Sequence, residues 1–385
     1  MIEAILLLLA FSFGIHVSLA NLGIGLSTVV PLLKRKGEKK NDNRIINVSR
    51  ELMKFYASIY AIIGVFGTAF TVFLLSFYPD FIGLAGHIAF YPFAIAILAI
   101  ALHFLAITTY WYGWDRWDSK THYYIGLLLL ISVYLIPFGF RSIFAFLNIP
   151  IGLEFEPKLH LNVFVALTNP TFIPLYLKTI FAALSATFFV IASGYMYRYV
   201  KKRDEYALEI SKMFMPYATV MLLLTLIFGI IYALALYYYV PYKFNNAFGR
   251  NLWMFAVKMI MVLLQFYAVY VFYRYIKHGV VKNANIIIIA GPAALIGIFS
   301  GEMLNSFSQY PYFVAKLGDP DFISAIPEPY RSSIFDALTM FKFNPLTSMP
   351  SLYIITAMFL VPLLIATVLF LYLSLIAKEK TDLPE

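Results

Sequence analysis

The chain has 385 residues, of which 62% are hydrophobic and only 13% are charged; this balance excludes a soluble domain and indicates a helical protein with several membrane spans. No cysteine is present, which excludes disulfides, thiolate metal sites and cysteine-ligated iron–sulfur clusters. The formal net charge of +9 lies largely in short loops. It is typical of a topology signal, so we expect no nucleic-acid partner.

Nine apolar segments are long enough to cross a bilayer, since a transmembrane helix needs roughly 20 apolar residues. In chain order they are residues 2–33, 52–78, 86–112, 122–147, 172–198, 213–240, 252–276, 284–308 and 351–377. We therefore predict an all-α fold in which residues 1–385 form one polytopic membrane domain of about nine helices.

The lysines and arginines predict the orientation of these spans. Most of the 29 fall in the loops after the first, fifth and seventh spans and at other positions on the same side. Basic loops stay on the cytoplasmic side of a membrane. We therefore expect the N-terminus outside and the C-terminus in the cytoplasm, which requires an odd number of spans and agrees with nine.

The first span carries His16, about fifteen residues from either end of an apolar run. An ionisable ring at such depth is costly to bury and indicates a functional site, and imidazole is a common axial ligand of haem iron. His103 in the third span lies at a similar depth, because a helix rises roughly 1.5 Å per residue. The two rings are therefore candidates to hold one metal or one haem. The alternative is that each ring bonds a backbone carbonyl or a hydroxyl such as that of Thr108.

A second polar group is predicted near the outer face. Lys178, Lys258 and Glu302 each lie about six residues from the outer end of a span, and each is expensive alone in lipid, so we expect them to pair. Such an ion pair would join the fifth, seventh and eighth spans. The functional alternative is a role in quinol binding, haem propionate pairing or proton uptake. Met259 or Met261 is a weaker candidate as an axial ligand, because methionine in an apolar helix usually packs.

Other residues give weaker signs of a functional site. His87 and His122 lie at span ends and are expected at the membrane interface. The sequence has no metalloprotease, P-loop or dinucleotide-binding motif. Gly23 and Gly25 are small positions in the first span, and we interpret them as sites of close helix packing.

Several short motifs resemble subunit I of the cytochrome bd-type quinol oxidases. Residues 112–116, Tyr-Gly-Trp-Asp-Arg, are the most specific and resemble the family's Phe-Gly-Trp-Asp-Arg at the end of its third helix. Residues 16–26 look like its first helix, with a haem-ligating histidine. Residues 255–259 look like the start of its seventh helix, where a basic residue precedes a haem-ligating methionine. Asn169-Pro170 and residues 309–312 resemble the family's Asn-Pro and a changed form of its Gly-Arg-Gln-Pro-Trp.

The departures from the family pattern are as informative. The family's low-spin haem is held by a histidine eight residues after the proline of Asn-Pro, and that position is Lys178 here. The family's third-helix glutamate falls on His103, and a glutamate ligand of its high-spin haem falls on Ser306. Its long quinol-binding loop is reduced to residues 240–251. The resemblance therefore implies that the quinol site and low-spin haem site are changed, while His16 remains.

The resemblance implies a multi-pass subunit of a bd-type terminal oxidase in the cell membrane of a prokaryote. The complex would oxidise quinol and reduce oxygen to water. This chain would hold a haem of b and/or d type with its iron at His16, and a second, homologous or unlike, membrane subunit would be its partner. The alternative is a haem-free structural subunit that pairs with a complete subunit I in place of subunit II, with Lys178 and Glu302 filling the emptied haem pocket. Whether the chain is itself catalytic stays open.

Overall fold

The computed structural model describes residues 2–77, 86, 88–155, 159–328, 330–332 and 334, with the backbone alone for residues 2–8 and 75–77. Eight helices in this part are long and apolar enough to cross a membrane, so the predicted all-α membrane fold is confirmed. They are α1 (Ile2–Lys40), α2 (Asn43–Phe77), α4 (Phe90–Tyr112), α5 (Ser119–Asn148), α7 (Phe172–Lys202), α8 (Glu205–Tyr239), α10 (Leu252–Arg274) and α11 (Ala284–Ser308). The predicted ninth span, residues 351–377, and His87 lie outside the described residues.

Several helices extend beyond the apolar segments that predicted them, and caps mark their ends. The sixth span was predicted from residue 213, but α8 begins at Glu205 because the Asp204 carboxylate accepts hydrogen bonds from the backbone N–H groups of Tyr206 and Ala207. Asp118 caps α5 in the same way. Hydropathy marks only the part of a helix that lies in lipid, so it misses these polar first and last turns.

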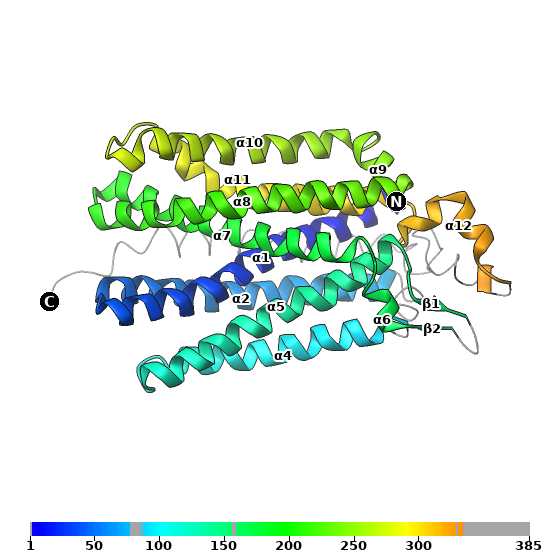
Figure 1. Ribbon diagram of the computed structural model, residues 1–385, viewed down its shortest axis with the longest axis horizontal. Coiled ribbons are helices and arrows are strands. Elements are labelled where there is room, and N and C mark those ends of the chain that lie inside the picture. The colour runs from blue at the N-terminus through cyan, green and yellow to red at the C-terminus, as the bar shows by residue number, and fades with distance from the viewer. Residues whose placement is uncertain are drawn as a thin grey trace.

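The short elements gather at one end of the bundle, which we call the hairpin end (Figure 1). They are β1 (Leu153–Glu154) paired antiparallel with β2 (His160–Leu161), α6 (Val163–Ala166), α9 (Pro241–Phe248), the 3₁₀ turn η2 (Ala315–Gly318) and α12 (Pro320–Ala325). The opposite end holds the turns that join α1 to α2, α4 to α5 and α7 to α8, and the 3₁₀ turn η1 (Ile276–His278). Because the clustered lysines and arginines lie there, we call it the basic end.

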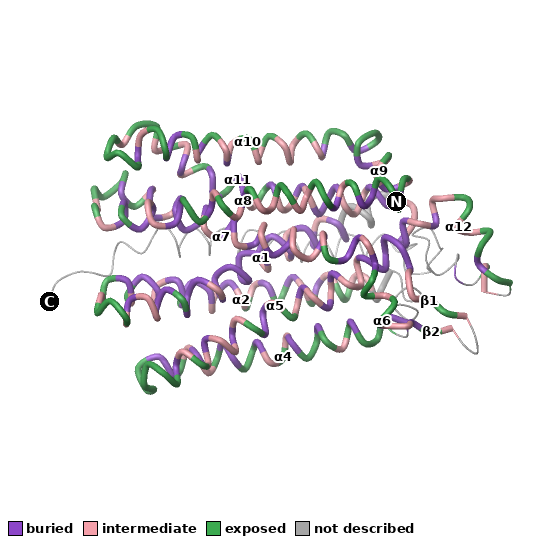
Figure 2. The backbone as a smooth tube through the Cα atoms, in the orientation of Figure 1, coloured by how far each residue is buried: buried purple, intermediate pink, exposed green. Residues whose placement is uncertain are grey.

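Helix α1 lies in the middle of the bundle, where α2, α5, α7 and α11 pack against it. Figure 2 shows α1 largely buried, whereas α4, α8 and α10 carry many exposed positions. The close approach of α1 and α7 depends on a glycine: a Cβ on Gly25 would lie 2.0 Å from Thr187 Oγ1. The predicted packing role of Gly25 is therefore confirmed.

Candidate functional site

His16 lies on α1 with its ring against α2. Its Nδ1 is 3.0 Å from the backbone carbonyl oxygen of Ile63. A carbonyl oxygen only accepts hydrogen bonds, so Nδ1 must carry the proton, and in the neutral ring Nε2 then keeps a free lone pair. Metal-ligating histidines usually donate their other N–H to a carbonyl or carboxylate in this way. The geometry therefore leaves His16 Nε2 ready to ligate a metal.

A glycine of α2 and an aromatic cluster one turn earlier on α1 lie around His16. Gly67 of α2 makes room for the ring, since a Cβ there would lie 2.8 Å from His16 Cε1. One turn before His16, the Phe13 ring contacts Phe70 and Phe144, with centroids 4.9 and 5.4 Å apart. Within the described residues no three His, Cys, Asp or Glu side chains gather around a metal position. The donor chemistry at His16 thus fits a haem iron better than a bare metal ion.

His103 on α4 is fully buried and has both ring nitrogens engaged. Its Nε2 shares a short hydrogen bond with the Tyr56 hydroxyl, and its Nδ1 lies 2.8 Å from Ser132 Oγ. Tyr56 in turn accepts a hydrogen bond of 2.6 Å from Ser27. The sequence left open that His103 bonds a hydroxyl group rather than a metal, and its ring does contact two hydroxyl groups. The hydroxyl that the sequence suggested, that of Thr108, instead donates to the backbone of its own helix.

The two histidine rings touch one stripe of α2 at different heights. His103 contacts the rings of Tyr56 and Tyr60, whereas His16 contacts α2 at Ile63 and Gly67. At roughly 1.5 Å per residue these contacts are about 10 Å apart along the helix. Two imidazoles on one metal each need a bond of about 2 Å. This arrangement therefore does not bring the two rings to one metal.

Near the hairpin end, Glu302 of α11 forms a buried ion pair with a residue that the sequence reading missed. Its Oε1 lies 2.9 Å from Nη2 of Arg141 on α5. Both side chains are buried, and the second atom of each, Arg141 Nη1 and Glu302 Oε2, has no hydrogen-bond partner among the described residues. Arg141 is the one arginine inside the apolar segment 122–147, which is the signal that could have revealed it.

Lys178 and Lys258 lie near this pair without joining it. The Lys178 ammonium sits 4.9 Å from the centroid of the Tyr232 ring, and the end of the Lys258 side chain lies beside Gly301. Within the described part of the chain, neither lysine nitrogen comes within 4 Å of the Glu302 carboxylate. Direct pairing of these lysines with Glu302 was the expectation, but the planar guanidinium of Arg141 takes that place, as suits a buried pair.

A further buried cation comes from the short helix α9. Lys243 is only 2% exposed, and its Nζ donates to Asn148 Oδ1 at 2.7 Å and to Gln309 Oε1 at 3.1 Å. Burial lowers the pKa of Lys243 to about 7. We call Arg141, Lys178, Lys243, Lys258 and Glu302 the charge group. Its four basic residues face one carboxylate, so it fits an anionic group such as a carboxylate better than a metal ion.

The helices that carry His16 and Met259, α1 and α10, both pack against α11. Ser18 of α1 reaches the backbone carbonyl of Leu295, whereas Met261 of α10 lies beside Gly297. Met259 is half-buried on α10. Its role as an axial ligand stays a prediction.

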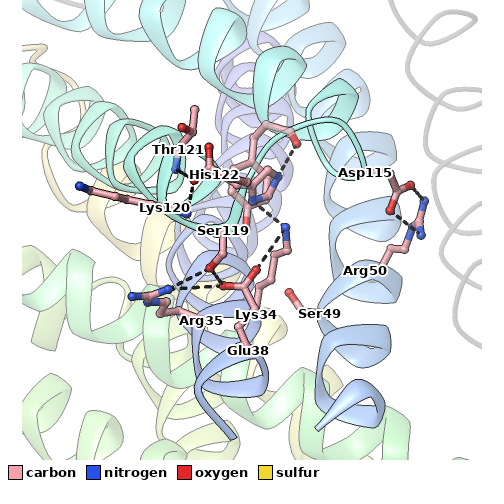
Figure 3. Close-up of polar contacts among 12 residues, drawn as sticks. Lys34, Arg35, Glu38, Ser49, Arg50, Asp115, Ser119, Lys120, Thr121 and His122 are labelled. Carbon is pink, nitrogen blue, oxygen red and sulfur yellow. Dashed lines mark hydrogen bonds and ion pairs between the residues drawn. The ribbon is translucent and has the colours of Figure 1, made fainter. Parts of the chain in front are cut away.

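The Gly-Trp-Asp-Arg motif builds a joint at the basic end (Figure 3). Asp115 pairs with Arg50 of α2, and the Lys34 ammonium lies 4.6 Å from the centroid of the Trp114 ring. A Cβ on Gly113 would lie 2.3 Å from Trp117 Cε3, so only glycine fits there. The motif therefore ties the end of α4 to α1 and α2.

His122 completes this joint in the first turn of α5. It is 1% exposed. Its Nε2 lies 3.0 Å from the Tyr110 carbonyl oxygen and its Nδ1 lies 2.9 Å from Lys34 Nζ. Since Nε2–H must donate to the carbonyl, Nδ1 accepts from the lysine. The ring lies at a span end, as the sequence predicts, and the neighbouring helices cover it.

Comparison with known proteins agrees with these motifs. The model of the family "Cytochrome bd terminal oxidase subunit I" matches residues 7–251. A Bacillus subtilis protein provisionally named cytochrome bd menaquinol oxidase subunit I is 22% identical over 196 residues, which are 50% of this chain and 44% of that protein. The chain thus aligns with less than half the length of this relative.

The fold has a solved counterpart. The structure of bd oxidase from Geobacillus thermodenitrificans superposes with a TM-score of 0.76 and 18% identity, covering 96% of this chain and 98% of that chain. This likeness is one of fold. The chain belongs to the cytochrome bd terminal oxidase subunit I family and is a multi-pass protein of the plasma membrane.

Proposed function

We propose that this chain is a subunit of a bd-type terminal oxidase complex that oxidises quinol and reduces oxygen to water, and that His16 holds a haem iron through Nε2. Family membership supports the oxidase assignment. The single observation that carries the haem assignment is the contact of His16 Nδ1 with the Ile63 carbonyl, because it fixes the tautomer that leaves Nε2 free.

A haem of b and/or d type at this position would supply one-electron redox chemistry and a place for oxygen to react. The protein's own contribution is orientation. Ile63 fixes the plane and tautomer of the imidazole, and Gly67 leaves the space that the ring occupies. His103 serves in this proposal as a hydrogen-bonded core residue rather than as a ligand.

The partner in this proposal is a second, homologous or unlike, oxidase subunit in the same bilayer. Lys178 stands where the resemblance places a haem-ligating histidine, and a protonated ammonium has no lone pair for iron. The segment between α8 and α10 is taken up by the short helix α9. Quinol would therefore be oxidised mainly on the partner, and electrons would reach this chain from there. Met259 on α10 is the weaker ligand candidate in this proposal.

The second candidate is a haem-free structural subunit that replaces subunit II beside a complete subunit I. The buried pair of Arg141 and Glu302 favours it, because these residues occupy the region of the lost low-spin site with charges that hold each other. In that case the charge group would be a helix-joining element, and His16 would keep its carbonyl bond without iron.

Haem quantification on the purified complex separates the two candidates. We expect a His16→Gly complex to assemble, to lose one haem per copy of this chain in pyridine haemochrome and reduced-minus-oxidised spectra, and to recover the signal when imidazole is added. The control is His278→Gly, which changes an exposed histidine of η1. Unchanged haem content in the His16 variant would rule out the ligand proposal. Haem bound only to the partner would support the structural subunit.

A further inference from the structure

A cavity of about 340 Å³ opens at the basic end of α1. We call it the basic pocket. Its lining residues are Leu32, Arg35, Lys36, Lys39, Lys40 and Tyr123. The five α1 positions follow the spacing of one helix face, which repeats at three and four residues. One face of α1 thus lines most of the pocket, and Tyr123 of α5 lines its side.

Among the described residues, the positive charge of the pocket has little negative charge beside it. Arg35 has an acidic neighbour there, with Nη1 3.7 Å from a Glu38 oxygen. Lys36 Nζ lies 3.3 Å from the Met213 sulfur. No carboxylate of the described residues lies within 4 Å of the nitrogens of the three pocket lysines. Three ammonium groups that share one cavity repel each other, so an anion bound between them would be stabilised.

Arg35 and Tyr123 give the pocket a fixed wall. The Arg35 guanidinium donates to Ser119 Oγ at 2.9 Å and lies 5.2 Å from the centroid of the Tyr123 ring. Figure 3 shows Arg35 reaching both Ser119 and Glu38. This wall joins the end of α1 to the start of α5, so a ligand in the pocket would touch both helices.

The pocket lies at the level where apolar surface gives way to charge. Leu32 at its inner edge is 48% exposed, and α5 continues away from it with the exposed side chains of Tyr124 and Ile131. The end that carries the basic loops is cytoplasmic by the positive-inside rule. A phosphate at this level belongs to the headgroup layer, with an apolar surface next to it for acyl chains.

We propose that the basic pocket binds the phosphate headgroup of an anionic phospholipid of the cytoplasmic leaflet. Lys36, Lys39 and Lys40 supply the charge, and the exposed side chain of Leu32 lies against an acyl chain. Free phosphate shares the headgroup chemistry but cannot use the apolar edge. The lipid would bridge α1 and α5 beside the joint of Trp114 and Asp115, and would therefore stabilise the basic end of the bundle.

The test measures lipid retention on the delipidated complex by native mass spectrometry and its thermal unfolding in detergent. We expect phosphatidylglycerol to bind and raise the melting temperature more than phosphatidylcholine does. The variant Lys36→Gln/Lys39→Gln/Lys40→Gln should bind phosphatidylglycerol about a hundredfold more weakly, since each basic residue near an anionic surface contributes roughly a factor of five.

The matched control is Lys120→Gln/Lys277→Gln/Lys282→Gln, which removes the same charge from three exposed positions at the same end of the molecule. It should keep the lipid effect. Equal loss in both variants, or no loss in the pocket variant, would overturn the proposal. Equal stabilisation by inorganic phosphate at the same concentration would also overturn it, because the site would then bind a soluble anion.

Discussion

The His16 site and the charge group are both polar places inside an apolar bundle, but they satisfy their polar atoms in different ways. At His16 one ring nitrogen is bonded to a carbonyl and the other is left with a lone pair. In the charge group Glu302 is held by Arg141, and further cations stand around the pair. The first arrangement leaves one lone pair over, whereas the second holds its one carboxylate and leaves positive charge over. Burial and depth alone therefore do not tell a ligand site from a structural one.

The largest expected effect comes from breaking the pair in the charge group. Arg141→Met leaves Glu302 charged, buried and without its partner, and removing one member of such a pair costs about 3–5 kcal/mol. We expect a large fall in the unfolding midpoint of the complex, with the haem content of the complex unchanged in the folded fraction. The double variant Arg141→Met/Glu302→Met should recover much of the loss. An Arg141→Met protein as stable as the parent would show that the pair does not hold these helices together.

The sequence could predict the spans but not the partners within this group. The eight described spans agree with the predicted segments because their apolar residues are continuous. The partner of Glu302 is Arg141 of the fourth span, whereas the sequence pointed to lysines of the fifth and seventh spans. Arg141 lies 161 positions from Glu302 in sequence. The hydroxyl partners of His103 likewise come from two other helices. A single sequence gives the depth of a side chain in a span, but its neighbours depend on how each helix is rotated.

The second prediction tests Lys243 of the charge group through the pH dependence of the protein's stability. Its pKa is lowered from 10.5 to about 7 by burial, so between these values the unfolded chain binds more protons than the folded chain. Stability should then rise as pH increases from 7 to 9, by roughly 2 kcal/mol or less, since one pKa unit corresponds to about 1.4 kcal/mol. Lys243→Met should be destabilised at every pH, because Asn148 and Gln309 lose a donor, and should lack this rise. Parallel stability curves for parent and variant would contradict the assignment.

The third prediction tests the space around His16, and a neighbouring glycine supplies its control. Gly67→Ala places a methyl group 2.8 Å from His16 Cε1, so the ring must move, and crowding of this kind costs about 1–3 kcal/mol. Gly64→Ala adds the same methyl group where nothing lies within 4 Å. If His16 holds iron, Gly67→Ala should shift the haem absorbance or lower haem content, and Gly64→Ala should change neither.

The same pair of variants also separates the two candidate functions. In a haem-free structural subunit, Gly67→Ala would lower the unfolding midpoint by a small amount and leave every haem signal of the complex as it was. In a haem-bearing subunit the spectral change should exceed what the loss of stability explains, because the methyl group acts on the ligand ring itself. Equal spectra for the two alanine variants would remove the main support for iron at His16, since the ring would then have moved without any effect on the haem.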